Sequence, residues 1–88
     1  MQSNDIMIYG ADWCEDTQET REHLDELGVQ YQYINVEQDE GAAEWVKRQN
    51  DGKQKTPTVK FPDLVLSVPS NAQLDAALQT RGLLPRGD

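Results

Sequence analysis

A short apolar run leads directly to the single cysteine in the segment Asp5-Ile-Met-Ile-Tyr-Gly-Ala-Asp-Trp-Cys-Glu-Asp-Thr17. Residues 5–9 are mainly apolar and are closed by Gly10, a pattern typical of a buried β-strand. Residues 15–27 are rich in helix formers and are followed by a glycine, which predicts a helix that stops there. Cys14 is therefore predicted to lie between a buried strand and the first turn of a helix.

Strand and helix patterns continue to alternate through the middle of the chain. Residues 31–36 are rich in aromatic and β-branched side chains and predict a second strand, and residues 41–49 predict a second helix. Residues 57–61 and 64–68 predict two further strands joined at Pro62-Asp63. Because that connection is too short for a parallel crossover, these two strands should form an antiparallel hairpin.

A last helix is predicted after the hairpin. Ser70 or Asn71 caps its start and Gly82 ends it, which leaves residues 83–88 as a loose tail. The order is βαβαββα, with a right-handed crossover between the first two parallel strands. We expect an α/β fold in which residues 1–88 form one domain, with a four-stranded mixed sheet and helices on both faces.

Composition excludes several classes of protein. None of the 88 residues belongs to an apolar stretch of about 20, the length of a membrane span, and no basic-then-apolar leader is present. One cysteine excludes an intramolecular disulfide framework and a cysteine-rich zinc site, so we expect no metal. A net charge of -8 argues against nucleic acid and membrane as partners. We expect a soluble, cytoplasmic monomer.

Charge is distributed unevenly along the chain. Residues 1–44 hold twelve acidic residues and one basic residue, Arg21, whereas residues 45–88 hold seven basic and four acidic residues. Five of the basic residues lie between positions 47 and 60. They form either an ordinary solvated surface or a small anion-binding rim.

The position of Cys14 favours a reactive thiol. A helix N-terminus presents free N–H groups and partial positive charge, which stabilise the thiolate that attacks disulfides. The alternative is an inert, buried cysteine. Glu15 and Asp16 follow directly, and negative charge there opposes the helix by raising the pKa of the thiol, so the sequence leaves the balance open. Thr17 stands where a Cys-x-x-Cys pair would place its second cysteine, so an outside thiol must resolve any mixed disulfide.

Several segments in order carry a family resemblance. They are Trp13-Cys14 before a helix, Ala42-Ala43-Glu44-Trp45-Val46, Asn50-Asp51-Gly52-Lys53, Thr56-Pro57-Thr58-Val59-Lys60-Phe61 and Pro69-Ser70-Asn71. Together, over roughly residues 5 to 84, they resemble a glutaredoxin of the thioredoxin fold. The similarity is closer to the small mycoredoxin-type glutaredoxins, although Thr17 replaces the second cysteine of the commoner family motif.

The resemblance implies a thiol–disulfide oxidoreductase. Cys14 matches the nucleophile that attacks mixed disulfides between protein substrates and a small thiol, which is glutathione or mycothiol. Pro57 matches a cis-proline, and Thr56 then offers its backbone N–H and C=O to the small thiol. Ser70 and Asn71 match the helix start that binds the carboxylate of the small thiol, in agreement with the anion affinity of helix N-termini.

Three further positions are candidates around the sulfur. Trp13 is expected to shield Cys14 or to pack beside it, and the Thr17 hydroxyl either donates a hydrogen bond to the sulfur or belongs to a semi-buried helix position. Lys55, with Lys53, either frames the far end of an anionic thiol or is solvated.

Two other functions remain open at this point. In one, the chain is a catalytically weak interaction or redox-sensing module, in which Cys14 is only glutathionylated or buried. In the other, two chains each supply Cys14 and two small thiols complete the ligands of an iron–sulfur cluster.

Overall fold

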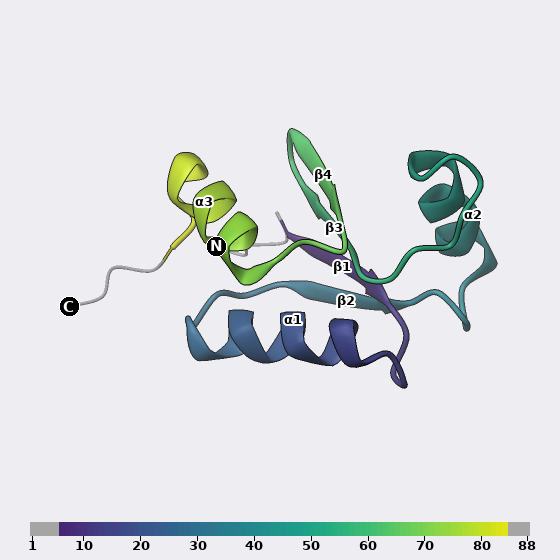
Figure 1. The fold of residues 1–88 in the computed structure, drawn as a ribbon, viewed down its shortest axis with the longest axis horizontal. Helices are drawn as coiled ribbons and strands as arrows, with labels where there is room; N and C mark the ends of the chain where they lie inside the picture. The colour runs from purple at the N-terminus through teal and green to yellow at the C-terminus, as the bar shows by residue number, and fades with distance from the viewer. Residues whose placement is uncertain (1–5, 85–88) are drawn as a thin grey trace.

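The computed structural model describes residues 6–84 and has the predicted βαβαββα order (Figure 1). Its elements are β1 (Met7–Gly10), α1 (Glu15–Glu26), β2 (Gln32–Asn35), α2 (Glu40–Gln49), β3 (Thr58–Phe61), β4 (Leu64–Ser67) and α3 (Asn71–Arg81). The strands lie in the order β2-β1-β3-β4, with β1 parallel to β2 and antiparallel to β3. The predicted β3–β4 hairpin is confirmed, with Phe61 paired with Leu64. Asp5, the first residue of the predicted first strand, lies outside the described residues.

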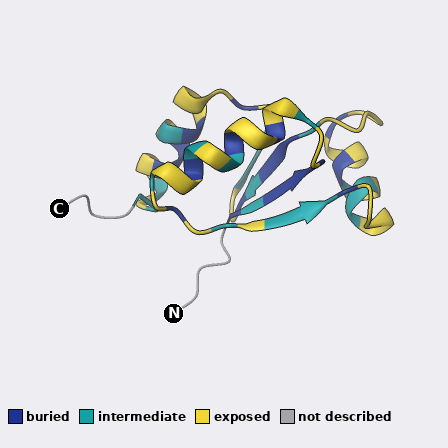
Figure 2. Cartoon of the chain, turned by 90° about the horizontal axis from the view of Figure 1, so that it is seen from below, coloured by how far each residue is buried: buried dark blue, intermediate teal, exposed yellow. Residues whose placement is uncertain are grey.

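Helices cover both faces of the sheet, as the sequence predicts (Figure 1). Successive side chains of β1 point to opposite faces, so Ile8 joins the core under α1 and α3, whereas Tyr9 joins the core under α2. The rings of Tyr9 and Trp45 lie 4.6 Å apart in that second core. The central strands β1 and β3 are mostly buried, and the edge strands β2 and β4 are mostly half-buried (Figure 2).

The prediction of a loose tail is wrong for its first two residues. Gly82 ends α3 with a φ of 66°, and the N–H of Leu83 then donates to the carbonyl of Leu78 at 2.9 Å. This turn returns the chain to the protein, where Leu83 and Leu84 pack against the larger core. Residues 85–88 lie outside the described part of the chain.

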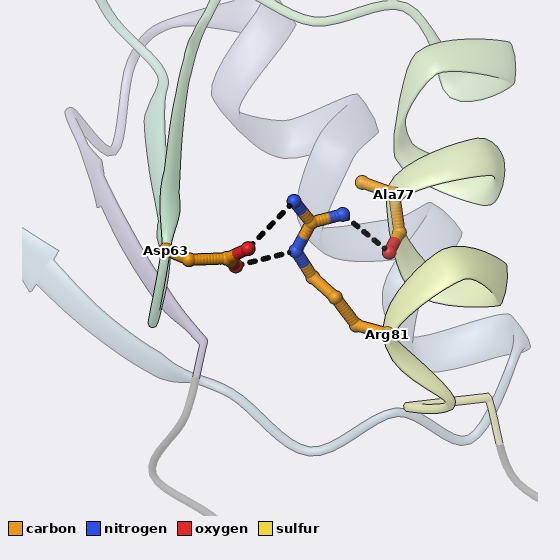
Figure 3. Close-up of polar contacts among 3 residues, drawn as sticks. All are labelled: Asp63, Ala77 and Arg81. Carbon is orange, nitrogen blue, oxygen red and sulfur yellow. Dashed lines mark hydrogen bonds and ion pairs between the residues drawn. The ribbon is translucent and has the colours of Figure 1, made fainter.

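Polar contacts tie α3 to its neighbours. The Arg81 guanidinium binds both carboxylate oxygens of Asp63 in the β3–β4 turn, at 2.7 and 3.2 Å, and also donates to the carbonyl of Ala77 (Figure 3). His23 of α1 contacts Asp75 of α3 at 2.7 Å. These contacts fix α3 against the hairpin and against α1. No helix within residues 6–84 is long and apolar enough to cross a membrane.

The start of α1 lies unusually close to the end of β1. A Cβ atom placed on Gly10 would lie 2.5 Å from Cγ2 of Thr17 and 2.6 Å from its Oγ1, and Thr17 is fully buried. Only glycine therefore allows this approach.

We predict that Gly10→Ala lowers the free energy of unfolding by about 1–3 kcal/mol, because the new methyl group overpacks a buried contact. Gly41→Ala is the matched control, since a Cβ there would be 3.5 Å from its nearest neighbour, the Asp39 carboxylate. It should leave stability unchanged or raise it by up to about 1 kcal/mol, as expected in a helix. Urea unfolding of both variants measures the difference; equal midpoints would contradict the packing argument.

Candidate functional site

Cys14 is the N-cap residue of α1. Its own N–H donates to the carbonyl of Ala11 at 3.1 Å, and its carbonyl accepts the first hydrogen bond of the helix, from the N–H of Gln18, at 3.0 Å. The Cys14 side chain does not form a regular N-cap hydrogen bond, so the thiol at the N-terminus of α1 is not committed to capping the helix. The predicted placement of the sulfur between β1 and α1 is confirmed.

The segment before β3 supplies the second wall of the site. The Sγ atom of Cys14 lies 3.5 Å from the carbonyl oxygen of Thr56 and 3.4 Å from the Thr56 hydroxyl. The peptide bond between Thr56 and Pro57 is cis, as the resemblance implies. A protonated thiol can donate to the carbonyl, whereas a thiolate accepts from the hydroxyl, so the sulfur has a partner in either state.

Local hydrogen bonds determine the acidity of Cys14. Burial acts to raise the pKa of the thiol, but hydrogen bonds from the Thr56 and Thr17 hydroxyls and from the backbone N–H groups of Thr17 and Asp16 outweigh it, so the pKa lies below its ordinary value. The side chains of Glu15 and Asp16 are exposed, and water screens their repulsion of the thiolate. The balance that the sequence leaves open therefore favours the thiolate.

Thr17 combines the two roles considered for it. Its side chain is fully buried, beyond the semi-buried position expected, and Oγ1 accepts the N–H of Ala11 at 3.4 Å. Its hydroxyl also contributes a hydrogen bond that lowers the pKa of Cys14. The residue that replaces a second cysteine thus both packs against β1 and supports the sulfur.

Trp13 is mostly exposed, which excludes packing as an ordinary core residue, and its shielding of Cys14 stays a prediction. Its side chain is 69% exposed, and its indole N–H donates to the Glu37 carboxylate at 2.6 Å. The bond to Glu37, in the loop between β2 and α2, holds the ring mainly in solvent.

Three residues that the sequence argument missed hold the loop before Cys14. Besides Glu37, they are Asp12 and Tyr33: the Tyr33 hydroxyl donates to the Asp12 carboxylate at 2.7 Å. Burial, together with the bond to Asp12, raises the pKa of Tyr33 to about 12, so this hydroxyl stays protonated. The Arg21 guanidinium lies 3.9 Å from the centre of the Tyr33 ring. These partners are 21 and 24 residues apart in sequence, and no local pattern signals them.

A pocket of about 420 Å³ lies between α1 and the start of α3. The predicted residues Ser70 and Asn71 line it, with Asp16, Glu19, Thr20, Val68, Pro69 and Gln73. The Ser70 hydroxyl accepts the N–H of Gln73 at 3.1 Å, and the Gln73 side chain accepts the N–H of Ser70 at 2.9 Å. The capping box occupies the backbone N–H groups of Ser70 and Gln73, which a bound anion would need as donors. Asp16 and Glu19 add negative charge to the pocket, and this charge disfavours a carboxylate there.

The remaining predicted residue, Lys55, lies elsewhere. Lys53 and Lys55 are exposed on the segment that leads to Thr56 and are not among the residues that line the pocket. No group of three or more His, Cys, Asp or Glu residues within positions 6–84 is arranged to hold a metal ion.

Comparison with known proteins agrees with this geometry. The sequence model of the family described as Glutaredoxin matches residues 6–64. The chain belongs to the glutaredoxin family. It is mycoredoxin-like: it is 43% identical to Mycoredoxin 1 of Corynebacterium glutamicum over 60 residues, which cover 68% of this chain and 73% of the relative. A Mycobacterium tuberculosis protein described as a glutaredoxin is 32% identical over 74 residues, or 83% of this chain and 88% of that protein.

Solved structures agree on the fold of this glutaredoxin. The glutaredoxin-like NrdH-redoxin from Escherichia coli superposes with a TM-score of 0.73 at 27% identity, covering 81% of this chain and 91% of that one. A glutaredoxin from Archaeoglobus fulgidus gives a TM-score of 0.72 at 19% identity, covering 86% and 87%. The thioredoxin-like α/β fold is therefore established.

We predict that Thr56→Val slows alkylation of Cys14 by iodoacetamide about three- to tenfold at pH 6. The substitution keeps the shape of the side chain but removes the donor that stabilises the thiolate, so the pKa of Cys14 rises and less thiolate is present below it. Rates of the variant and the wild type should converge at high pH. Thr80→Val, at an exposed position of α3, is the matched control and should leave the profile unchanged. Equal rates at pH 6 would contradict a role for the hydroxyl.

Proposed function

We propose that this glutaredoxin is a single-cysteine thiol–disulfide oxidoreductase that reduces mixed disulfides between proteins and a small thiol through Cys14. The observation that carries the proposal is the environment of the sulfur. Sγ lies at the N-terminus of α1 and within 3.4 Å of the Thr56 hydroxyl, and hydrogen bonds lower the pKa of the thiol. These are the conditions that favour a nucleophilic thiolate.

The reaction has two exchange steps. The Cys14 thiolate attacks the small-thiol sulfur of the mixed disulfide, a new S–S bond forms, and the protein substrate leaves as a thiolate. A second small-thiol molecule then attacks the bond to Cys14, which regenerates the Cys14 thiolate and releases the oxidised dimer of the small thiol. The second thiol molecule is thus the electron donor. The Thr56 backbone lies beside Sγ, where it is suited to position the incoming disulfide.

Because Thr17 stands where a second cysteine would be needed, the second step must use a thiol from another molecule. A dithiol mechanism needs a second cysteine, and Cys14 is the one cysteine of the sequence. The NrdH-redoxin structure is described as having a thioredoxin-like activity profile, but the buried threonine cannot support an intramolecular version of such chemistry here. We therefore favour a monothiol route.

We further propose mycothiol as the small thiol. Glutathione carries two carboxylates and one ammonium group and is a net anion, whereas mycothiol, an acetylated cysteine joined to a glucosamine–inositol unit, carries no charge beside its thiol. The pocket between α1 and the start of α3 has Asp16, two residues after Cys14, and Glu19 in its wall, and no lysine or arginine among its lining residues. An uncharged, hydroxyl-rich group avoids repulsion there and can exchange hydrogen bonds with Ser70 and Asn71. Similarity to Mycoredoxin 1 supports this choice, and Lys55 is then a solvated residue.

The mechanism suits a monomeric domain in a reducing compartment. A free thiol that must return to its reduced state requires a reducing thiol pool, such as that of the cytoplasm. One Cys14 thiol suffices for both exchange steps, so the proposed reaction needs no second copy of the chain.

We predict that wild-type protein turns over a small mixed-disulfide substrate in the presence of mycothiol, while Cys14→Ser shows no turnover above background. The serine hydroxyl cannot form the mixed disulfide on which both steps depend. Thiol consumption coupled to a disulfide reductase measures the rate. Full activity of Cys14→Ser would refute the proposal, and inactive wild-type protein with either thiol would favour the interaction-module alternative.

We predict that the double variant Asp16→Asn, Glu19→Gln raises kcat/KM with glutathione about three- to tenfold and changes it less than twofold with mycothiol. Removing the two charges removes repulsion from the glutathione carboxylates but not an interaction with a neutral sugar. Asp25→Asn, an exposed acid near the far end of α1, is the control for net charge. An equal gain with both thiols would contradict selection by this pocket.

A further inference from the structure

Two large hydrophobic side chains are exposed within residues 6–84: one belongs to the residue directly before Cys14, and the other to a residue whose backbone is hydrogen-bonded to the residue after Thr56. Trp13 directly precedes Cys14 and is 69% exposed, and Val68 is 42% exposed. The N–H of Val68 donates to the carbonyl of Pro57 at 2.8 Å, and Val68 lines the pocket together with Asp16. The exposed Trp13 and Val68 side chains offer apolar area that a partner approaching Cys14 and Thr56 can cover.

Hydrogen bonds within the free protein hold the Trp13 side of this surface in place. The bond of 2.6 Å to Glu37 holds the Trp13 ring, and the bond between Tyr33 and Asp12 holds the loop that carries it. Val68 has a φ of 47°, a conformation that a β-branched residue rarely adopts and that is common at binding sites. A surface that is already ordered loses little entropy on binding.

The rim of this surface is negatively charged. Glu15 and Asp16 follow the sulfur, Glu19 lines the pocket, and Glu37 contacts the Trp13 indole; all four side chains are exposed. Arg21, the one basic residue of positions 1–44, is already engaged over the Tyr33 ring and with the Tyr31 hydroxyl. The four carboxylates therefore give the α1 and Glu37 side of the sulfur a negative charge, whereas the exposed Lys53 and Lys55 lie on the other side, on the segment before Thr56.

We propose, on the basis of the function proposed above, that Trp13 and the Glu15 and Glu37 carboxylates form a docking surface for disulfide-bearing protein segments with Lys or Arg beside the reacting cysteine, while the pocket lined by Val68, Asp16 and Glu19 holds the small thiol. The cation would lie against the Trp13 ring and the adjacent Glu37 carboxylate, which combines cation–π attraction with a charge pair. Acidic segments are repelled. A second copy of this chain, with its net charge of -8, is also disfavoured.

Three peptides that differ only in the residues on either side of their one cysteine test the inference. The cysteine is flanked on both sides by Lys in the first peptide, by Gln in the second and by Glu in the third. In each peptide the cysteine forms a mixed disulfide with thionitrobenzoate. Cys14 attacks the peptide sulfur, the bond to thionitrobenzoate breaks, and that group leaves as a coloured thiolate while the peptide remains bonded to Cys14. Rates are divided by those measured with 2-mercaptoethanol, which corrects for the intrinsic reactivity of each peptide.

We expect the lysine peptide to react about tenfold faster than the glutamate peptide at low salt, with the glutamine peptide between them. The ratio should approach one near 0.5 M salt, because rim charges are screened. Trp13→Ala and Glu37→Gln should each reduce the ratio at least twofold, while Asp25→Asn should retain it. All variants should react normally with a neutral small disulfide, which shows that the thiol and the fold are intact.

The outcomes separate this inference from the proposed function. Equal normalised rates for the three peptides, a preference that survives high salt, or a preference unchanged in both Trp13→Ala and Glu37→Gln overturns the docking surface. So does an absence of any thionitrobenzoate release. Charge-selective release without multiple turnover in the presence of either small thiol refutes the oxidoreductase function and leaves the docking surface in place.

Discussion

The contact between Gly10 and Thr17 determines where the reactive sulfur lies. Because Thr17 approaches to within 2.5 Å of the position that a Cβ on Gly10 would occupy, the first turn of α1 sits directly on the end of β1. That position places Cys14, three residues earlier, at the sheet edge where the segment leading into β3 arrives, and so within reach of Thr56. A helix start displaced by one side chain would leave the sulfur without its partner, Thr56, in the segment before β3.

Acidity at this site comes from short-range contacts rather than from net charge. Glu15 and Asp16 are exposed, so water weakens their effect on the sulfur, whereas the Thr56 hydroxyl lies 3.4 Å from Sγ and, with Thr17, lowers the pKa of the thiol. Adding charge to the first turn of a helix therefore does not prevent a thiolate, provided that donors reach it directly. The same turn also supplies N–H groups from Asp16 and Thr17, which no side-chain substitution on the surface removes.

Local patterns in the sequence were sufficient for the fold and for part of the site. The order of strands and helices was predicted from the spacing of apolar side chains and from the positions of glycines, and it is confirmed. The cis peptide bond before Pro57 was implied by the family resemblance and is also present. The hydrogen-bond partner of Trp13 could not be predicted because Glu37 is 24 residues away and belongs to a loop without a motif. Ser70 was expected to bind a carboxylate, but the acids that face its helix come from α1 and meet it only in the folded chain. Long-range polar contacts of this kind have no periodicity.

Because position 17 is a threonine, the choice of reaction partner depends on the surface around Cys14 and not on a second cysteine inside the site. With no second cysteine, each step of the proposed reaction depends on an approaching molecule, so the groups around the sulfur control which molecules arrive. Exposed carboxylates act weakly on Cys14 while water surrounds them. A docked partner displaces that water, and the same charges then interact more strongly with whatever the partner brings. An acidic rim can thus leave the thiolate reactive in the free protein and still discriminate between partners in the complex.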